Sequence, residues 1–269
     1  MNHKESILLV GGGNMGQALL RGWLADDRAP DSIRVVDPAE QARSVVGSLG
    51  IKAFAGRPHS FRADVIVLAV KPHLVEGALQ DYRDLADGEA TLLTIAAGKT
   101  IGFYQDLLGS GAAIVRGMPN TPAAIGKGIT ALAANDVVGT AQRQLCESLM
   151  DAVGQVVWLE DDGLMDSVTA VSGSGPAYVF LLIECLVAAA EKVGFDRVLA
   201  ERLALATVAG AGAYAMASGT DPAELRRQVT SPGGTTQAAL EVLIGDSRAL
   251  ESLLSEAVQA ATRRSRELA

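Results

Sequence analysis

A glycine-rich turn follows directly on an apolar run near the start of the chain, in the stretch "ILLVGGGNMGQALL" (residues 7–20). Gly11, Gly13 and Gly16 have the spacing Gly-x-Gly-x-x-Gly between a predicted strand and a predicted helix. Such a turn lets a pyrophosphate approach the backbone and places it at a helix N-terminus. Glycines of this spacing also occur in purely structural turns, but the strand before them and the helix after them favour a dinucleotide-binding βαβ unit.

The first 160 residues alternate between apolar runs and segments long enough for a crossover helix. The predicted strands are residues 7–10, 33–36, 64–70, 91–97, 112–118, 128–134 and 155–160. Continuous apolar runs fit a parallel sheet that is covered on both faces. We therefore expect an α/β fold with a Rossmann-type, doubly wound, mostly parallel sheet in a dinucleotide-binding domain over residues 1–160.

The rest of the chain, residues 161–269, is predicted to be helical. The expected helices are residues 177–194, 197–218, 221–229 and 248–268. The third begins with Asp221, Pro222 and Glu224, which suit an N-cap, a first-turn proline and the acid of a capping box. The second has almost no polar face, so a partner subunit or its own neighbours must cover it. We expect an all-α dimerisation and substrate domain, and a homodimer.

Charge and composition exclude several classes of partner. A net charge of −8 gives no basic surface for nucleic acid or for an anionic membrane. The apolar runs are too short for a membrane span, and the first residues lack an extended signal region. Cys146 and Cys185 have no metal-ligand spacing and are expected to be buried free thiols. We expect a cytoplasmic protein that acts on a small molecule and has no metal site.

Asp37 ends the second predicted strand, about 20 residues beyond the third glycine of the turn. An acid at this place binds the ribose hydroxyls of NAD and repels the 2′-phosphate of NADP. Arg34 and Arg43 are close enough in sequence to offer a phosphate clamp instead. These residues leave the choice of cofactor open between NADP(H) and NAD(H).

Three further turns follow successive predicted strands: "AVKP" (69–72), "AAG" (96–98) and "MPNTP" (118–122). In open parallel sheets, ligands bind outside the carboxyl ends of the strands. Each turn alone fits an ordinary chain reversal, but three in succession favour a cofactor cleft. Lys71 either steers an anionic ligand or is a solvated turn residue.

Five motifs together resemble those of the pyrroline-5-carboxylate reductases. These are "GGGNMG", "AVKP", "MPNTP", "VSGSGPAY" (171–178) and "TSPGGTT" (230–236), and the last two are the most specific. The resemblance extends over essentially the whole chain. It implies NAD(P)H-dependent reduction of 1-pyrroline-5-carboxylate to L-proline, a Rossmann domain followed by a helical dimerisation domain, and a larger ring of dimers such as a decamer.

The resemblance, together with the strand-end turns, assigns site residues. The predicted cofactor-binding residues are Gly11, Gly12, Gly13, Asn14, Met15, Gly16, Asp37, Ala69, Val70, Lys71, Pro72, Ala96, Ala97, Gly98 and Asn120. The predicted substrate-binding residues are Ser174, Gly175, Ser231, Gly233, Gly234, Thr235 and Thr236. Two positions depart from the family pattern: Asp37 replaces a small polar residue of many members, and Gly56 replaces an Asn that some relatives place near the adenosine ribose.

The stretch "VTSPGGTTQAAL" (residues 229–240) lies between two predicted helices and is expected to be a loop, and it contains no residue that ionises near neutral pH. A protonated cyclic imine already accepts a hydride well, so the site needs no strong acid. Its task is to align the nicotinamide C4 with the imine carbon and to exclude water. Backbone N–H groups of a glycine-rich turn can hold the substrate carboxylate. Thr236 is the predicted catalytic residue, with its hydroxyl near the ring nitrogen. Ser172 and Ser174 fit either helix caps or a substrate pocket.

Three other functions are alternatives. A β-hydroxyacid-type oxidoreductase would share the front half of the chain and carry a catalytic Lys on a helix of the second domain, but the apolar stretch "TVAGAGAYAM" has none. A related imine oxidoreductase is a second alternative. A non-catalytic NAD(P)-binding protein would keep the glycine turn and lose "TSPGGTT", which is present.

Overall fold

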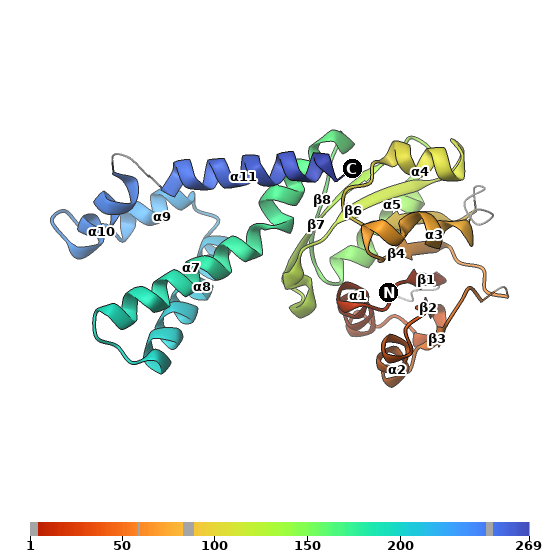
Figure 1. Ribbon diagram of the computed structural model, residues 1–269, viewed down its shortest axis with the longest axis horizontal. Helices are drawn as coiled ribbons and strands as arrows, with labels where there is room; N and C mark the ends of the chain where they lie inside the picture. The colour runs from red at the N-terminus through yellow and green to blue at the C-terminus, as the bar shows by residue number, and fades with distance from the viewer. Residues whose placement is uncertain (1–4, 59, 83–88, 246–249, 269) are drawn as a thin grey trace. The chain divides into compact units, whose positions relative to one another are not determined.

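The computed structural model describes residues 5–58, 60–82, 89–245 and 250–268. Its described part contains one sheet, with the strand order β3-β2-β1-β4-β5-β6-β7-β8 (Figure 1). The strands are β1 (Ile7–Val10), β2 (Ile33–Val36), β3 (Lys52–Phe54), β4 (Val65–Leu68), β5 (Thr91–Thr94), β6 (Ile114–Met118), β7 (Gly128–Ala134) and β8 (Gly154–Trp158). Neighbouring strands are parallel except for β6 and β7. The predicted mostly parallel sheet is confirmed.

Helices cover both faces of this sheet. They are α1 (Asn14–Ala25), α2 (Glu40–Ser48), α3 (Val75–Gln80), α4 (Ile101–Leu108), α5 (Thr140–Asp151) and α6 (Met165–Val168). Successive strand residues enter different cores: Leu9 packs in one cluster with Trp23, and Leu8 packs in the other with Tyr104. This two-sided burial explains why the strands are apolar without alternation.

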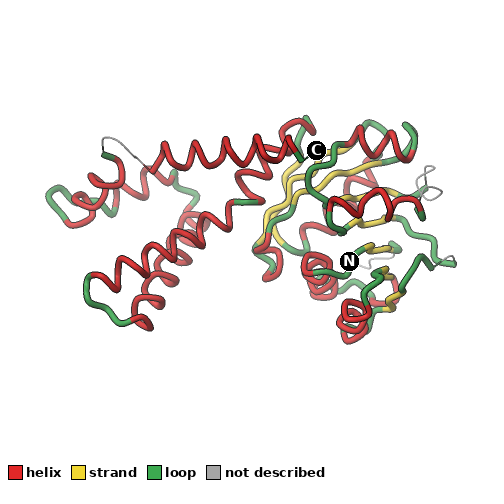
Figure 2. The backbone as a smooth tube through the Cα atoms, in the orientation of Figure 1, coloured by secondary structure: helices red, strands yellow, loops and turns green. Residues whose placement is uncertain are grey.

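The chain divides into two compact units (Figure 2). The first contains the residues up to Ser174 and returns from Ala261 onward. The second, Gly175–Ala260, contains α7 (Gly175–Lys192), α8 (Arg197–Ser218), α9 (Pro222–Gln228), α10 (Thr235–Ile244) and most of α11 (Leu250–Glu267). The expected domain boundary at residue 160 lies where the strand-like sequence gives way to helical sequence, whereas the two units are separated by their packing. The boundary at residue 160 therefore stays a prediction.

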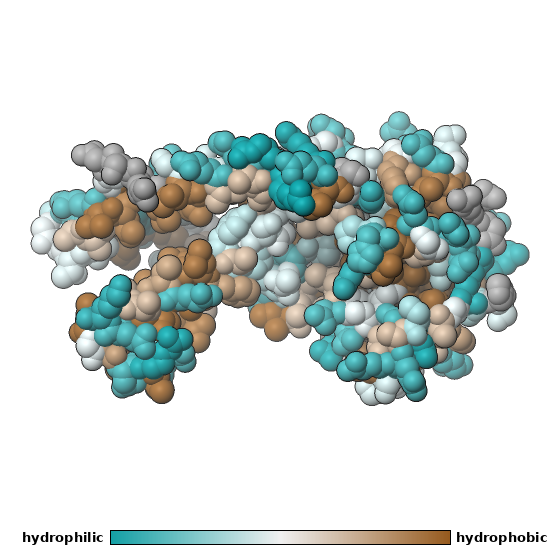
Figure 3. All heavy atoms as spheres, in the orientation of Figure 1, coloured by the Kyte–Doolittle hydropathy of each residue, from teal (hydrophilic) through white to brown (hydrophobic). Residues whose placement is uncertain are grey.

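The second unit has a small core of its own. Val187 of α7 is buried with Ala200 and Ala204 of α8. Large apolar side chains of these helices are exposed, and Figure 3 shows apolar residues on the surface of this unit. They are Val179, Phe180, Leu181, Leu182, Leu186, Val198, Leu199, Leu203, Leu205, Tyr214 and Met216. Much of the apolar helix α8 is therefore left uncovered by the rest of the same chain. The prediction of a homodimer requires such an uncovered surface.

Local signals in the helical half were partly correct. The carboxylate of Asp221 accepts hydrogen bonds from the N–H groups of Ala223 and Glu224, which confirms the N-cap of α9. Glu224 accepts from the Arg227 side chain instead of closing a capping box, so that part of the prediction was wrong. Both cysteines are free thiols, and Cys146 is buried as predicted, but Cys185 is exposed in this chain, so its predicted burial was wrong. Burial raises the pKa of Cys146 to about 12.

Candidate functional site

The turns after β1, β4 and β5 lie side by side at the carboxyl edge of the sheet. The Ala69 N–H donates to the Val10 carbonyl at 2.8 Å, and the Ile95 N–H donates to the Leu68 carbonyl at 3.0 Å. The Gly11 N–H continues the ladder on the other side, to the Val36 carbonyl at 2.8 Å. Three of the predicted site segments therefore meet at the edge where such sheets bind ligands.

The glycine-rich turn fits a dinucleotide pyrophosphate. Gly11 has a φ of +107°, and a Cβ there would lie 2.5 Å from the Ala69 carbonyl oxygen. Gly13 is the N-cap of α1, and a Cβ there would meet no atom within 4 Å, so the space above it is open. The first turn of α1 holds no acidic residue, and its N–H groups have no partners within the helix. An anion can therefore approach this helix N-terminus closely.

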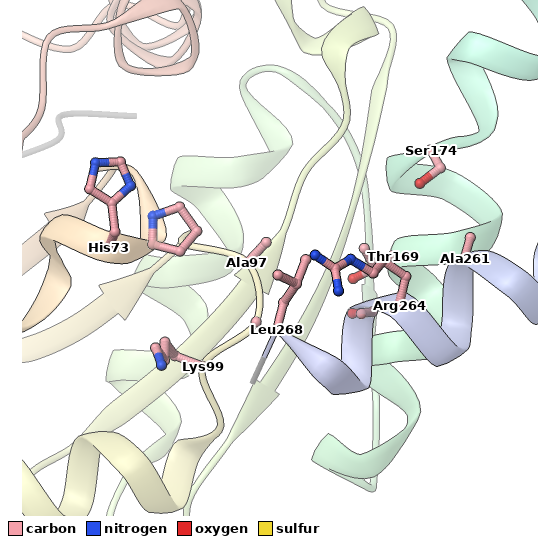
Figure 4. A pocket seen from close by; sticks show the side chains of 11 residues that line it. His73, Ala97, Lys99, Thr169, Ser174, Ala261, Arg264 and Leu268 are labelled. Carbon is pink, nitrogen blue, oxygen red and sulfur yellow. The ribbon is translucent and has the colours of Figure 1, made fainter.

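A cavity of about 620 Å³ lies beside the turns that follow β4 and β5 (Figure 4). Its volume is in the ordinary range for a small-molecule site. Four of its lining residues were predicted as site residues: Pro72, Ala97, Gly98 and Ser174. Seven were not: His73, Lys99, Thr169, Ala261, Arg264, Ser265 and Leu268. The last four belong to α11 or directly follow it.

The end of α11 is fixed against the first unit. Ser265 is buried, and its hydroxyl donates to Asp166 Oδ1 at 2.6 Å. The Leu268 carbonyl packs closely on Gly98, because a Cβ added to Gly98 would lie only 3.1 Å from the Leu268 carbonyl oxygen. Arg264 extends from α11 toward the turn that carries Ala97 (Figure 4). Among the described residues that line the cavity none is acidic, and Lys99 and Arg264 are cationic, with Arg264 also donating to Glu267 Oε2 at 2.9 Å. The lining therefore favours an anionic or electron-rich ligand.

Other predicted cofactor residues have different surroundings. Asn14 and Met15 line a second cavity of about 370 Å³, next to the 3₁₀ turn Thr121–Ile125. Ala96 is 3% exposed and offers a ligand little surface. The amide of Asn120 accepts from the Ile129 N–H at 3.0 Å and donates to the Ser172 carbonyl at 3.2 Å. This amide therefore holds the protein together, and its contact with a cofactor stays a prediction.

The "VSGSGPAY" motif lies inside a helical run and not at a helix start. Residues Thr169–Gly173 form a π-helical turn between α6 and α7, and the Ser174 N–H donates to the Thr169 carbonyl at 2.8 Å. Pro176 has no N–H to offer the Ser172 carbonyl, and Asn120 supplies that bond instead. The helix-capping interpretation of Ser172 and Ser174 was wrong, because the chain is already helical before them.

Tyr104 supports the turn after β5. Its hydroxyl lies 2.7 Å from Thr94 Oγ1 in the core, and the Ala96 N–H reaches the same Oγ1 at 3.4 Å. Burial raises the pKa of Tyr104 to about 12, so its hydroxyl stays protonated at neutral pH. The hydroxyl pair therefore holds the backbone that leads to Ala97.

Removing this hydroxyl should cost stability. Tyr104→Phe is expected to lower the free energy of unfolding by about 1–2 kcal/mol, because Thr94 loses a buried partner. Urea unfolding at fixed protein concentration, followed by circular dichroism, measures the change. The double variant Tyr104→Phe, Thr94→Val should cost less than the sum of the two single changes. An additive result would show that the two hydroxyls are not coupled.

The "TSPGGTT" motif lies in the second unit. Its first five residues form a loop, and its last two, Thr235 and Thr236, begin α10. The predicted loop 229–240 ends at Gly234, the N-cap of α10, so residues Thr235 to Leu240 were wrongly predicted as loop. The Gly233 N–H donates to Gln237 Oε1 at 2.7 Å, and the Gly234 N–H donates to the Ser231 carbonyl at 3.0 Å. The glycine N–H groups are thus already bonded, one within the motif and one to Gln237 directly after it.

Comparisons with known proteins agree with this architecture. Residues 162–268 match the family model described as pyrroline-5-carboxylate reductase dimerisation, and residues 6–98 match NADP oxidoreductase coenzyme F420-dependent. The pyrroline-5-carboxylate reductase of Pseudomonas aeruginosa is 41% identical, covering 98% of this chain and 96% of that protein. A solved pyrroline-5-carboxylate reductase from Coxiella burnetii has a TM-score of 0.94 at 36% identity over 99% of both chains. The Plasmodium falciparum pyrroline carboxylate reductase, solved with NADP bound, has a TM-score of 0.87 at 28% identity, covering 100% of this chain and 99% of that one.

Proposed function

Because this chain belongs to the pyrroline-5-carboxylate reductase family, we propose that the cavity beside the β4 and β5 turns is where hydride transfer takes place. The protein is an NADP(H)-binding oxidoreductase that reduces 1-pyrroline-5-carboxylate to L-proline. The reduced nicotinamide, when bound, supplies the hydride. The observation that carries this placement is the cavity of about 620 Å³ at the carboxyl edge of the sheet.

The dinucleotide is proposed to lie along this edge. Residues 11–16 would hold its pyrophosphate, and Asp37 would hold the adenosine ribose. Residues 69–72 and 96–98 would hold the nicotinamide half, where Ala97 and Gly98 line the cavity. The open space at Gly13 and the exposed first-turn N–H groups of α1 support the pyrophosphate position.

The substrate carboxylate is proposed to bind at the start of α10. The N–H groups of Gly233 and Gly234 are already bonded, so the first-turn N–H groups at Thr235 and Thr236 are the better donors. Ser231 and Ser174 are proposed as further polar contacts to the substrate, and Gly175 as a small residue that leaves it room. The Thr236 hydroxyl, partly exposed, is proposed to contact the ring nitrogen. Its role is either to relay a proton or to orient the ring.

The protein is an oligomer through its helical half, residues 162–268. We propose a homodimer as its building block and a ring of five dimers as its final state. The exposed apolar side chains of α7 and α8 support the dimer. Light scattering on the purified protein should give about ten times the chain mass of 27.8 kDa. A mass of only twice that value would contradict the ring.

Two helical runs also have the length and apolar composition of membrane spans, Asp162–Lys192 and α8. Both runs lie in the part that matches the dimerisation model, so we propose that they face other subunits. Because the two runs are assigned to contacts between subunits and not to a membrane, we also propose a cytoplasmic location. The protein should then stay in the supernatant after cell membranes are sedimented without detergent.

Turnover tests the function directly. Purified protein with 1-pyrroline-5-carboxylate should oxidise NADPH or NADH, followed by the loss of absorbance at the nicotinamide band, and should release proline. Blanks without substrate and with a β-hydroxyacid plus NADP⁺ should show no reaction. Turnover of the β-hydroxyacid, or none with either reduced cofactor from a folded oligomer, would contradict the proposal.

A further inference from the structure

The carboxylate of Asp37 has a fixed position at the end of β2. Its Oδ2 accepts a hydrogen bond from the Gly12 N–H at 2.7 Å, and its Oδ1 accepts one from the Ala39 N–H at 2.8 Å. Both donors are backbone groups, and one belongs to the glycine-rich turn itself. The negative charge therefore lies beside the turn that binds the pyrophosphate, and each oxygen keeps a lone pair for a further donor.

The two nearby arginines are held in other contacts. The Arg34 guanidinium donates to the carbonyls of Asp31 and Ile33, both at 2.9 Å, and lies 5.1 Å from the centre of the Phe61 ring. The Arg43 guanidinium donates to the carbonyl of Asp37 at 2.9 Å and to that of Pro38 at 2.7 Å. Neither arginine forms an ion pair with the Asp37 carboxylate in the described structure, so neither neutralises it.

We propose that Asp37 makes NAD(H) the preferred dinucleotide of this protein, with NADP(H) bound more weakly. The two free lone pairs of the carboxylate can accept from the 2′- and 3′-hydroxyls of the adenosine ribose. A 2′-phosphate at the same place would put up to two negative charges against a carboxylate that both backbone hydrogen bonds hold in position. The inference rests on the proposed dinucleotide position and specifies how its adenosine end is recognised.

Binding of the oxidised cofactors tests this without any turnover. Isothermal titration calorimetry of the intact oligomer with NAD⁺ and with NADP⁺ should give about a tenfold lower Kd for NAD⁺, which corresponds to ~1.4 kcal/mol. The ratio should fall as salt is raised, because the repulsion is partly exposed to solvent.

Two variants separate charge from shape. Asp37→Asn keeps the side-chain size and one oxygen acceptor, and should raise the affinity for NADP⁺ while changing that for NAD⁺ less. Asp37→Ser should raise the affinity for NADP⁺ and lower that for NAD⁺, which reverses the preference. Asp31→Ser is the matched control: it removes the same charge from an exposed site before the start of β2, and should leave the Kd ratio unchanged.

Three results would overturn the inference. These are an NADP⁺ Kd equal to or below that of NAD⁺ in the unaltered protein, a Kd ratio that both Asp37 variants leave unchanged, and a selective loss of NADP⁺ binding in Arg43→Ala. The last result would mean that the Arg43 guanidinium leaves the carbonyls of Asp37 and Pro38 and binds the 2′-phosphate. A protein that binds both cofactors but never turns over pyrroline-5-carboxylate would contradict the proposed function and leave this inference intact.

Discussion

Replacing Gly11 with alanine is expected to lower the free energy of unfolding by more than about 3 kcal/mol and to abolish dinucleotide binding. Gly11 has a φ of +107°, which an alanine adopts only with strain. The added Cβ would also lie 2.5 Å from a backbone oxygen, that of Ala69, which is fixed in the ladder and cannot rotate away. Thermal unfolding without ligand and calorimetric titration with NADP⁺ measure the two effects.

Gly13→Ala is the matched control two residues further along the same turn. Gly13 has a φ of −72°, and a Cβ there meets no protein atom within 4 Å. The ligand-free protein should therefore be as stable as the unaltered one, while cofactor affinity falls because the Cβ occupies the space left for the pyrophosphate. Equal stability losses in both variants would show that the turn is not shaped as described.

Thr236→Val is expected to lower kcat/KM for pyrroline-5-carboxylate by about 100-fold, because it removes the hydroxyl and keeps the side-chain shape. A loss confined to kcat would assign proton relay to the hydroxyl, and a loss confined to KM would assign it to holding the ring. Thr236→Ser should restore most of the activity. Steady-state kinetics at saturating NADPH give all three values.

Thr230→Val serves as the control for that change. Its hydroxyl already donates a hydrogen bond to the carbonyl of Arg226, near the end of α9, at 2.6 Å. The same substitution there should leave kcat and KM near those of the unaltered protein. Unchanged kinetics in Thr236→Val would instead refute the role of that hydroxyl.

Most of the sheet could be predicted from local patterns. Residues 7–10, 33–36 and 128–134 have the predicted bounds of β1, β2 and β7, because each is a run of apolar residues that ends at a turn. The run 64–70 is a strand only over Val65–Leu68, since its last residues already belong to the turn that follows β4. β3 was not predicted, because three residues at a sheet edge, only partly buried, leave too short a pattern.

The helical half was harder, because its local signals have more than one structural meaning. Glycine and serine in residues 171–178 suggested a helix start, but a π-helical turn and the Asn120 amide allow the helix to continue through Pro176. In residues 229–240, Gly234 ends the loop by serving as an N-cap, which sequence alone does not distinguish from a further loop glycine. In the first place the deciding bond comes from a side chain distant in the sequence, and in the second from the local backbone geometry at Gly234.

The part of the cavity wall that α11 supplies could not be predicted from the sequence. Asp166 and Ser265 are far apart in the sequence, and neither is unusual in its own segment. Their contact brings Arg264 and Leu268 beside the turn after β5. Local periodicity carries no information on such a pairing, which only the folded chain reveals.

The return of the chain from Ala261 has a consequence for how the protein is made. The sheet and its glycine-rich turn leave the ribosome before residues 261–268 and can fold first, whereas the cavity gains part of its wall only when those residues follow. A chain that stops before Ala261 would thus keep the glycine-rich turn and lose the part of the cavity wall that α11 supplies. The cavity is therefore completed later in synthesis than the sheet beside which it lies.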